Sequence, residues 1–414
     1  MAWKDKKVER YSSHIQPTNF VINQQNVLSM MRLIKILCLL LLISGAVSAQ
    51  QNSRILTGAD QLERILKLTN GKKIALYVNQ TSMSGKIHLA DALKKQNSNL
   101  VKIFSPEHGF RGVADAGEDV ASSIDAGTGL PIVSLYGPNK KPKPEFLADV
   151  DVVIFDIQDV GVRFFTYISS LHYMMEACAE QKKKLIILDR PNPNSGYVDG
   201  PVLKKEFKSF VGMHPVPIAH GMSIGEYGKM VNGEGWLENG VKCDLEVVEM
   251  KNWKHGDRYS VPVRPSPNLP NDHAINLYPY TCLFEGTVLS LGRGTMNPFE
   301  MVGHPDLKSC DFTFTPVSIN GMAKHPVLEN QVCHGLDLRK VPASDRIDLS
   351  YLIQLYQAFP VKDKFFISYF EKLAGTDELR SMIRAGKSEE EIRASWKPEL
   401  EDFMKIRARY LLYP

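Results

Sequence analysis

The sequence predicts an α/β protein with a Rossmann-like, doubly wound and mostly parallel sheet, followed by a second, α+β domain. Between residues 54 and 205, short apolar runs alternate with stretches of helical periodicity, which is the pattern of βαβ units. The runs are nearly continuous in hydrophobicity, as expected of strands buried on both faces of a parallel sheet. The 414 residues, 43% of them hydrophobic, provide enough material for one large core or two smaller ones.

The first region is expected to contain five strands with helices between them. The strands are expected at residues 74–78, 101–104, 132–135, 150–155 and 185–188. The helices are expected around residues 60–67, 87–96 and 166–181. The glycine-rich dinucleotide fingerprint is missing after the first strand, where Asn79, Gln80 and Thr81 stand. We therefore expect neither a nicotinamide nor a flavin cofactor.

A passage rich in Pro, Gly and Asn, residues 190–201, closes this region. We expect a leader at residues 1–49, the Rossmann-like domain at 50–205 and the second domain at 206–414. Four prolines between residues 262 and 270 predict a stiff, extended loop that could wall a cleft. From residue 348 the pattern is helical, with Ser388 as the N-cap of a helix.

The leader resembles a secretory signal peptide. Two basic residues precede the apolar run 36–43, and small residues end at Ala49, where cleavage is expected. The run is shorter than the roughly 20 apolar residues that span a bilayer. Cys38 lacks the small residues that normally precede a lipidated cysteine. We therefore expect a periplasmic or secreted protein without a stable membrane anchor.

Charge and cysteine content argue against two further kinds of protein, nucleic-acid binders and metal-binding proteins. The chain has 50 basic and 46 acidic residues; its first 49 residues hold six and two of these, which leaves 44 of each sign. The chain beyond the leader therefore carries no net charge, which argues against a nucleic-acid partner. The five cysteines beyond the leader form no C-x-x-C pair, and H-E-x-x-H is missing, so no metal site is expected. Cys310 and Cys333 are the only pair considered for a disulfide.

Polar and charged residues follow three of the predicted strands. Ligands of open α/β sheets bind outside the carboxyl ends of the strands, so these residues predict a polar small-molecule site. Each acid taken alone would more often cap a helix or pair with an arginine, but the three strand ends taken together favour function. The residues are Glu107 and His108 after the second strand, Asp156, Asp159 and Arg163 after the fourth, and Arg190 and Asn192 after the fifth.

Two later segments also carry candidate residues. Residues 221–225 match the G-x-S-x-G elbow of serine hydrolases, with Ser223 as the serine and His220 just before it. Ser223 and Glu226 also spell a helix capping box, which is the favoured interpretation. Further on, glycines surround Glu285 and Arg293, which would let backbone approach a ligand closely, although turn chemistry alone could explain them.

Six motifs, taken in order, resemble the exo-β-N-acetylmuramidases of the NamZ type. They are SPEHGFRG, DIQDVGVRFFTY, LDRPNPNSGYVDGP, HGMSIGE, PSPNLPN and CLFEGT followed by GRGT. The resemblance implies an exported glycosidase that removes terminal N-acetylmuramic acid from the non-reducing ends of peptidoglycan fragments. It also implies a cleft between two domains and no nucleotide cofactor. The chain departs from relatives at Ser223, often a threonine, and at Leu291, sometimes an acid.

Glycoside hydrolysis needs a proton donor and a group that stabilises or attacks the anomeric carbon. Glu107 is the expected donor. The second group stays open among Asp156, Asp159, Glu285 and the 2-acetamido group of the substrate itself. The remaining expectations concern binding. Arg163, Arg190 and Arg293 are candidates for the lactyl carboxylate of muramic acid, and His108, His220, Asn192 and Asn268 for its hydroxyl or acetamido groups.

Two other functions compete with this interpretation. A wall-fragment binding protein would share the two domains and the cleft without turnover. A serine esterase or amidase would use Ser223 as its nucleophile.

Overall fold

A seven-stranded sheet organises the first half of the computed structural model, which describes residues 29, 31–32, 35, 54–107, 109–111 and 123–414. The strands lie in the order β5-β6-β4-β1-β7-β8-β9, and all pairs are parallel except β5 with β6. Without the edge strand β5, this is the Rossmann strand order, and the predicted fold class is confirmed. The strands are β1 (Ile74–Val78), β4 (Leu100–Ser105), β5 (Ser123–Ile124), β6 (Pro131–Ser134), β7 (Val152–Asp156), β8 (Lys184–Leu188) and β9 (Asp244–Val248).

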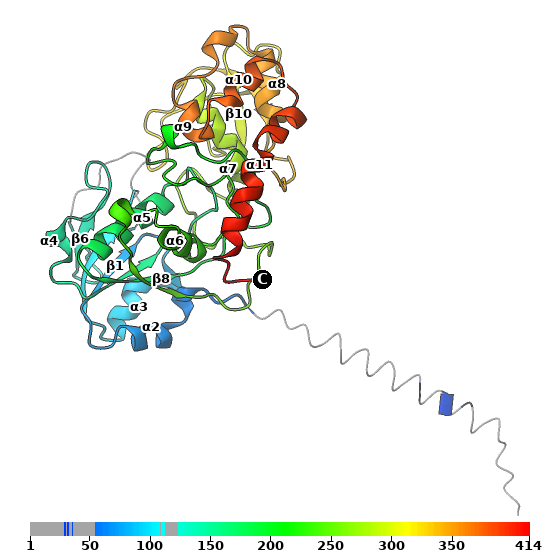
Figure 1. The fold of residues 1–414 in the computed structure, drawn as a ribbon. Helices are drawn as coiled ribbons and strands as arrows, with labels where there is room; N and C mark the ends of the chain where they lie inside the picture. The colour runs from blue at the N-terminus through cyan, green and yellow to red at the C-terminus, as the bar shows by residue number, and fades with distance from the viewer. Residues whose placement is uncertain (1–28, 30, 33–34, 36–53, 108, 112–122) are drawn as a thin grey trace, which may run out of the picture. The chain divides into compact units, whose positions relative to one another are not determined.

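Helices cover both faces of the sheet, because successive strand residues point to opposite sides. On one face Tyr77 and Phe155 pack with α4 (Pro144–Leu147), α5 (Tyr167–Glu180) and α6 (Ile224–Gly233). On the other face Leu76 and Ile154 pack with α2 (Leu62–Leu68) and α3 (Leu89–Lys95) (Figure 1). Short elements complete the region: η1 (Gly58–Asp60), β2 (Met83–Ser84), β3 (Ile87–His88), η2 (Lys205–Phe207) and η3 (Glu238–Gly240).

The five expected strands form within two residues of their predicted bounds. The helix expected from residue 87 begins two residues later, because residues 87–88 form β3 and His88 caps the helix. The sheet also has a strand that was not predicted, β9, whose sequence DLEVV alternates apolar with charged residues. β9 lies beyond residue 205. The domain boundary expected there stays a prediction, but the sheet takes its last strand from the later part of the chain.

The second region contains a small antiparallel sheet of order β10-β12-β11 and several helices. Its strands are β10 (Met301–His304), β11 (Phe312–Phe314) and β12 (Cys333–Asp337). Its helices are α7 (Asp272–Thr281), η4 (Cys282–Gly286), α8 (Ser350–Ala358), η5 (Lys362–Lys364), α9 (Phe370–Ala374), α10 (Glu378–Arg384) and α11 (Glu389–Ala408).

Helix α11 carries the chain back to the first region (Figure 1). Ser388 begins it with a capping box, as predicted: its Oγ accepts from the amide of Glu391 at 3.2 Å, and its own amide donates to Glu391 Oε2 at 2.9 Å. After the helix, the Tyr413 hydroxyl donates to Asp189 Oδ2 at 2.6 Å and accepts from the amide of Met250 at 2.9 Å. The C-terminus is therefore built into the edge of the seven-stranded sheet.

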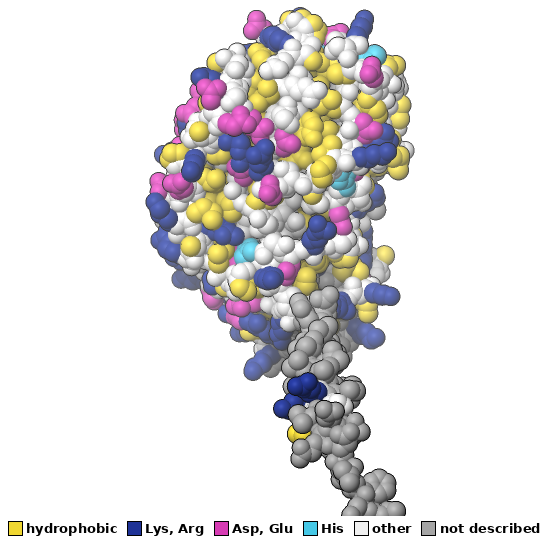
Figure 2. All heavy atoms as spheres, turned by 90° about the vertical axis from the view of Figure 1, so that its right-hand side faces the viewer, with side chains coloured by type: hydrophobic (Ala, Val, Ile, Leu, Met, Phe, Trp, Pro, Cys, Tyr) yellow, Lys and Arg dark blue, Asp and Glu magenta, His cyan; other side chains and the backbone are white. Residues whose placement is uncertain are grey.

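Residues 55–414 form one compact unit, and one of its apolar clusters contains residues of both regions. Basic and acidic side chains are interspersed over the face shown in Figure 2. Among the described residues, no helix is long and apolar enough to cross a membrane, and no cluster of His, Cys, Asp and Glu could hold a metal ion. Cys310 and Cys333 are free thiols, as are the three other cysteines beyond the leader. The expected cleavage site at Ala49 lies outside the described residues.

Candidate active site

A cavity of about 250 Å³ brings together three of the predicted residues, Glu107, Glu285 and Arg293. They come from far apart in the chain: Glu107 follows β4, Glu285 lies in η4, and Arg293 lies in the loop before β10. The rest of the wall is mostly aromatic. The other lining residues are Tyr136, Lys140, Phe164, Phe165, Thr166, Tyr167, Phe210, Val211, Ser266, Tyr278 and Tyr369.

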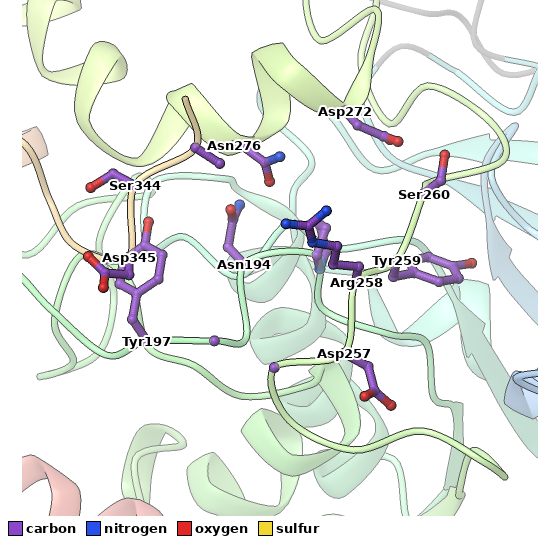
Figure 3. A pocket seen from close by; sticks show the side chains of 14 residues that line it. Asn194, Tyr197, Asp257, Arg258, Tyr259, Ser260, Asp272, Asn276, Ser344 and Asp345 are labelled. Carbon is purple, nitrogen blue, oxygen red and sulfur yellow. The ribbon is translucent and has the colours of Figure 1, made fainter. Parts of the chain in front are cut away.

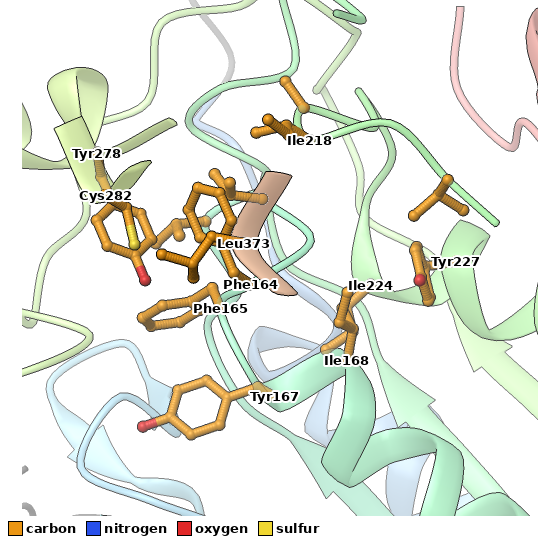
Figure 4. Close-up of a cluster of buried hydrophobic side chains, with 14 of the residues drawn as sticks. Phe164, Phe165, Tyr167, Ile168, Ile218, Ile224, Tyr227, Tyr278, Cys282 and Leu373 are labelled. Carbon is orange, nitrogen blue, oxygen red and sulfur yellow. The ribbon is translucent and has the colours of Figure 1, made fainter. Parts of the chain in front are cut away.

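The aromatic wall is packed edge to face, which fixes the shape of the cavity. The ring of Tyr278 meets those of Phe164 and Phe165 at centroid distances of 5.3 and 5.9 Å, both at 84° (Figure 4). Phe165 meets Tyr167 at 4.9 Å in the same manner. Such pairs add to the free energy gained by burying the rings. Tyr167 also donates to the carbonyl of Pro265 at 3.4 Å, so the predicted proline loop does form part of a wall.

Glu107 lies at the end of β4, where the doubly wound fold places ligand-binding groups. The hydroxyl of Tyr136 donates to its Oε1 at 3.1 Å. Burial raises the pKa of Tyr167 above its ordinary value, and the charge of nearby Glu107 adds to this shift. The carboxyl group therefore lies among phenol hydroxyls, half-buried and open to the cavity.

Glu285 is held by Arg293, whose Nε and Nη2 donate to Glu285 Oε1 at 3.0 and 2.6 Å. The guanidinium also lies 4.9 Å from the ring centre of Phe299. Tyr369 from the second region completes this side of the cavity. Burial raises the pKa of Tyr369, and the charges of Glu285 and Glu107 raise it further. Tyr369 thus keeps its proton as a donor within electrostatic range of both carboxyl groups.

Two of the other candidates, Asp156 and Arg190, form a buried ion pair with each other. Arg190 Nε donates to Asp156 Oδ1 at 2.6 Å, and Nη2 donates to Oδ2 at 2.8 Å. Nη2 also donates to the carbonyl of Met83 at 2.9 Å. Both side chains are buried, and neither lines the cavity. The geometry favours a structural role, in which the pair connects the ends of β7 and β8 to β2.

Arg163 is likewise occupied by the protein. Nη1 donates to the carbonyls of Pro201 and Val216, and Nη2 to those of Leu373 and Ala374, all at 2.7 to 2.8 Å. The side chain is 0% exposed. Burial lowers the pKa of Arg163 to about 9. This arginine joins the two regions, so the placement favours a structural role over contact with a substrate carboxylate.

Asp159 and His220 face each other in the interior, with Asp159 Oδ2 3.8 Å from His220 Nε2. Oδ2 accepts from the amide of Gly161 at 2.7 Å, while Oδ1 is buried without a partner among the described residues. Burial raises the pKa of Asp159 to about 7. Burial lowers the pKa of His220 to about 3, and the charges of Arg407 and Arg163 contribute. Neither side chain lines the cavity.

The two asparagine candidates are also buried, and each donates a hydrogen bond to a backbone carbonyl. Asn192 Nδ2 donates to the carbonyl of Met222 at 3.0 Å. Asn268 Nδ2 donates to the carbonyl of Met322 at 2.8 Å. His108 lies outside the described residues.

Ser223 is the N-cap of α6, as the capping box predicted. Its Oγ accepts from the amide of Glu226 at 3.2 Å and donates to Asp189 Oδ2 at 2.6 Å, and the residue is 0% exposed. His220 Nδ1 accepts instead from the amide of Met222 at 3.2 Å. The arrangement gives the serine hydrolase interpretation no support.

Sequence reasoning missed the aromatic wall and one cation. Lys140 lines the cavity with its Nζ 5.1 Å from the ring centre of Phe210, donating to the carbonyl of Gly137 at 2.6 Å. It forms no ion pair with a described residue. The residue type alone does not indicate that Lys140 lines a cavity. The loop after β6 lies at the carboxyl edge of the sheet, however, and this position could have identified Lys140 as a candidate.

Comparisons with known proteins match the whole of this architecture. The family model described as "Exo-beta-N-acetylmuramidase NamZ, N-terminal" matches residues 74–273, and its C-terminal counterpart matches residues 276–413. The peptidoglycan β-N-acetylmuramidase NamZ of Bacillus subtilis is 39% identical over 388 residues, covering 87% of this chain and 92% of that protein.

Two solved structures of DUF1343 family proteins from Bacteroides fragilis are similar to the chain. One has a TM-score of 0.82 and 48% identity, and the other a TM-score of 0.74 and 32% identity. Each comparison covers 87% of this chain and 99% of the other.

Proposed function

The chain belongs to the NamZ family of exo-β-N-acetylmuramidases and is a glycosidase, and from this we propose that it removes terminal β-N-acetylmuramic acid from the non-reducing ends of peptidoglycan fragments. The observation that carries the proposal is the cavity that Glu107 and Glu285 both line together with two cationic side chains, Arg293 and Lys140. Two carboxyl groups about an anomeric carbon suit glycoside hydrolysis, and the cations suit a sugar that carries a carboxylate.

Glu107 acts as the general acid. Its carboxyl proton passes to the glycosidic oxygen, the bond from that oxygen to the anomeric carbon breaks, and the electron pair leaves with the oxygen. The hydroxyl of Tyr136, 3.1 Å from Oε1, orients the carboxyl group for this transfer. Water then adds to the anomeric carbon, and the proton that it loses returns to the Glu107 carboxylate, which completes the hydrolysis and restores the acid.

Glu285 stabilises the positive charge that develops on the sugar ring. Two hydrogen bonds from Arg293 hold its carboxyl group in a fixed position, which is what an electrostatic stabiliser requires. Asp156 and Asp159 are buried away from the cavity, so Glu285 is the favoured second group among the protein's own carboxylates. The acetamido group of the substrate stays open as an internal nucleophile.

The lactyl carboxylate of muramic acid is bound by Lys140 and Arg293. Arg293 Nη1 makes no hydrogen bond to a described residue and can donate to the substrate while Nε and Nη2 hold Glu285. The aromatic wall of Phe164, Phe165 and Tyr278 keeps bulk water away from these contacts, which strengthens them.

We also propose that the protein is exported and loses its leader near Ala49, on the strength of the apolar run and small residues described above. The mass of the protein recovered from the periplasm or medium would show whether residue 50 or residue 1 begins the chain.

Turnover tests the proposed activity. The protein is incubated with a chromogenic β-glycoside of N-acetylmuramic acid and, separately, with the N-acetylglucosamine analogue, which lacks the lactyl group. We expect release from the first and little from the second. Binding of the muramic compound without release would instead make the protein a wall-fragment receptor, and equal release from both would contradict the role given to the cations.

A further inference from the structure

A second and larger cavity, of about 730 Å³, shares no lining residue with the catalytic one. It is formed by the turn at residues 193–197, the loop at 256–260, helix α7 and residues 343–345 (Figure 3). The turn belongs to the motif LDRPNPNSGYVDGP, of which the catalytic cavity uses nothing. A cavity of this size is within the range of small-molecule sites.

Asn194 is the fixed polar group of this cavity. Its Nδ2 donates to the carbonyls of Val160 and Ile275 at 2.9 and 3.1 Å, and the residue is 4% exposed. Its Oδ1 accepts no hydrogen bond from a described residue. Because Asn194 lines the cavity, this oxygen can accept a hydrogen bond from water or from a ligand there. The two bonds on Nδ2 hold this oxygen toward the cavity.

Two further side chains point into the same space. Figure 3 shows the guanidinium of Arg258 and the amide of Asn276 directed toward Asn194. Neither forms a hydrogen bond or ion pair with a described residue. The hydroxyl of Tyr197 is also buried without a partner there. The cavity therefore offers both donors and acceptors that the fold itself does not use.

The charge around the cavity limits what it can bind. The carboxylates of Asp257, Asp272 and Asp345 stand against the single guanidinium of Arg258, an excess of two negative charges. An anionic ligand is therefore disfavoured. The lining has no large aliphatic side chain, which disfavours an apolar ligand, whereas the rings of Tyr197 and Tyr259 can contact C–H faces.

We propose that this cavity is a second saccharide site that binds a neutral 2-acetamido sugar, with Asn194, Arg258 and Asn276 hydrogen-bonding its hydroxyl and acetamido groups. Amide and guanidinium groups can each contact two neighbouring polar atoms of such a ring. The choice of N-acetylglucosamine among neutral sugars rests on the proposed function, because peptidoglycan contains it beside muramic acid. The site would hold the part of a wall fragment that the catalytic cavity does not process.

The test is a calorimetric titration of the full chain with diacetylchitobiose, the β-1,4-linked dimer of N-acetylglucosamine. We expect one saturable site whose Kd rises about tenfold or more in Arg258→Ala and in Asn276→Ala, since each loses hydrogen bonds to the sugar. Arg384→Ala removes another exposed arginine, from α10, and should bind as the parent does. Arg258→Ala should also hydrolyse the chromogenic muramic glycoside at the parent rate.

Three results would overturn the proposal: no saturable binding, an unchanged Kd in both cavity variants, or loss of binding in Glu107→Gln, which would place the disaccharide in the catalytic cavity. Binding of an uncrosslinked wall tetrapeptide in place of the disaccharide would overturn it as well. The two proposals can fail separately. Hydrolysis of muramic glycosides without disaccharide binding rejects only the second site, and binding that depends on Arg258 without hydrolysis rejects only the proposed activity.

Discussion

Arg293 donates two hydrogen bonds to one oxygen of Glu285, from Nε at 3.0 Å and from Nη2 at 2.6 Å. In the proposed function, the guanidinium of Arg293 would contact both Glu285 and the lactyl carboxylate of the substrate. Lys140, in contrast, holds no carboxylate of the protein, because no described carboxylate pairs with it. The two cations should consequently respond differently to mutation.

We predict that Lys140→Ala weakens selection for muramic acid without harming hydrolysis as such. Loss of a charge-assisted contact with the lactyl carboxylate should lower kcat/KM for the muramic glycoside about tenfold to a hundredfold, and leave the glucosamine analogue unchanged. Arg293→Ala should lower both, since Glu285 loses its partner. Lys143→Ala, an exposed neighbour outside the cavity, is the control. An unchanged ratio of the two substrates in Lys140→Ala would assign the carboxylate to Arg293 alone.

The role of Glu107 predicts a dependence on the leaving group. Glu107→Gln keeps the shape of the side chain but removes the acid, so kcat for a natural disaccharide should fall by about 10² to 10⁴. A nitrophenyl leaving group scarcely needs protonation, so kcat for a nitrophenyl glycoside should fall much less when glycosylation limits the rate. Steady-state kinetics on both substrates, with Glu145→Gln as the control, decide the matter. Equal losses would mean a nucleophilic or positioning role.

The capping boxes of Ser223 and Ser388 provide a matched pair. Ser388 caps α11 at the surface, and Ser388→Ala should lower the free energy of unfolding by about 1 kcal/mol. Ser223 is buried and also donates to Asp189, so Ser223→Ala should cost about 2 to 3 kcal/mol. Urea titration measures both. Turnover by folded Ser223→Ala should match that of the parent. A loss of several hundredfold would instead support Ser223 as a nucleophile.

Asp159 and His220 predict opposing effects of pH on stability. The pKa of Asp159 is raised to about 7, so between about pH 4 and 7 the folded state binds more protons there, and this contribution to stability falls as pH rises. The pKa of His220 is lowered to about 3, so between about pH 3 and 6.5 the folded state binds fewer, and its contribution rises with pH. Between about pH 4 and 6.5 the two slopes cancel.

Single substitutions should reveal how Asp159 and His220 each change stability with pH. Relative to the parent, Asp159→Asn should gain stability as pH rises from about 4.5 to 6.5, and His220→Gln should lose stability over the same interval. Each slope can reach about 1.4 kcal/mol per pH unit. Urea unfolding at several pH values checks this, with contributions from other groups cancelling in the differences. If the free energy of unfolding changed with pH in the same way in the parent and both variants, the assigned proton binding by Asp159 and His220 would be wrong.

The seven-stranded sheet was predictable where burial on both faces makes strands continuously apolar, as in residues 74–78 and 185–188. The strand β9 was not, because Asp244 and Glu246 interrupt its apolar residues. Its pairing with β8 comes from tertiary structure, and an alternation of charged and apolar residues this short does not distinguish the strand from a surface segment.

The candidate site was predictable in part for a similar reason. Strand ends gave Glu107, and glycine-rich surroundings gave Glu285 and Arg293. The sequence could not show that Arg163 and Arg190 are already paired, because the partners of Arg163 include carbonyls 210 and 211 residues away. Nor could it separate Phe164 and Tyr278 of the cavity wall from ordinary core aromatics, since both environments select the same side chains.

The C-terminal attachment has a consequence for the order of synthesis. The seven strands of the large sheet are all present in sequence at residue 248, yet the buried carboxylate of Asp189 gains the Tyr413 hydroxyl only when residue 413 has been made. At 5 to 20 residues per second, ribosomes need about 8 to 33 s to add that remainder. During this interval the nascent chain holds a Rossmann-like region whose interior is still open at one edge. The native contacts of Asp189 therefore form only after residue 413 has been made, and nascent chains stalled before residue 413 should be more sensitive to protease than chains that include it.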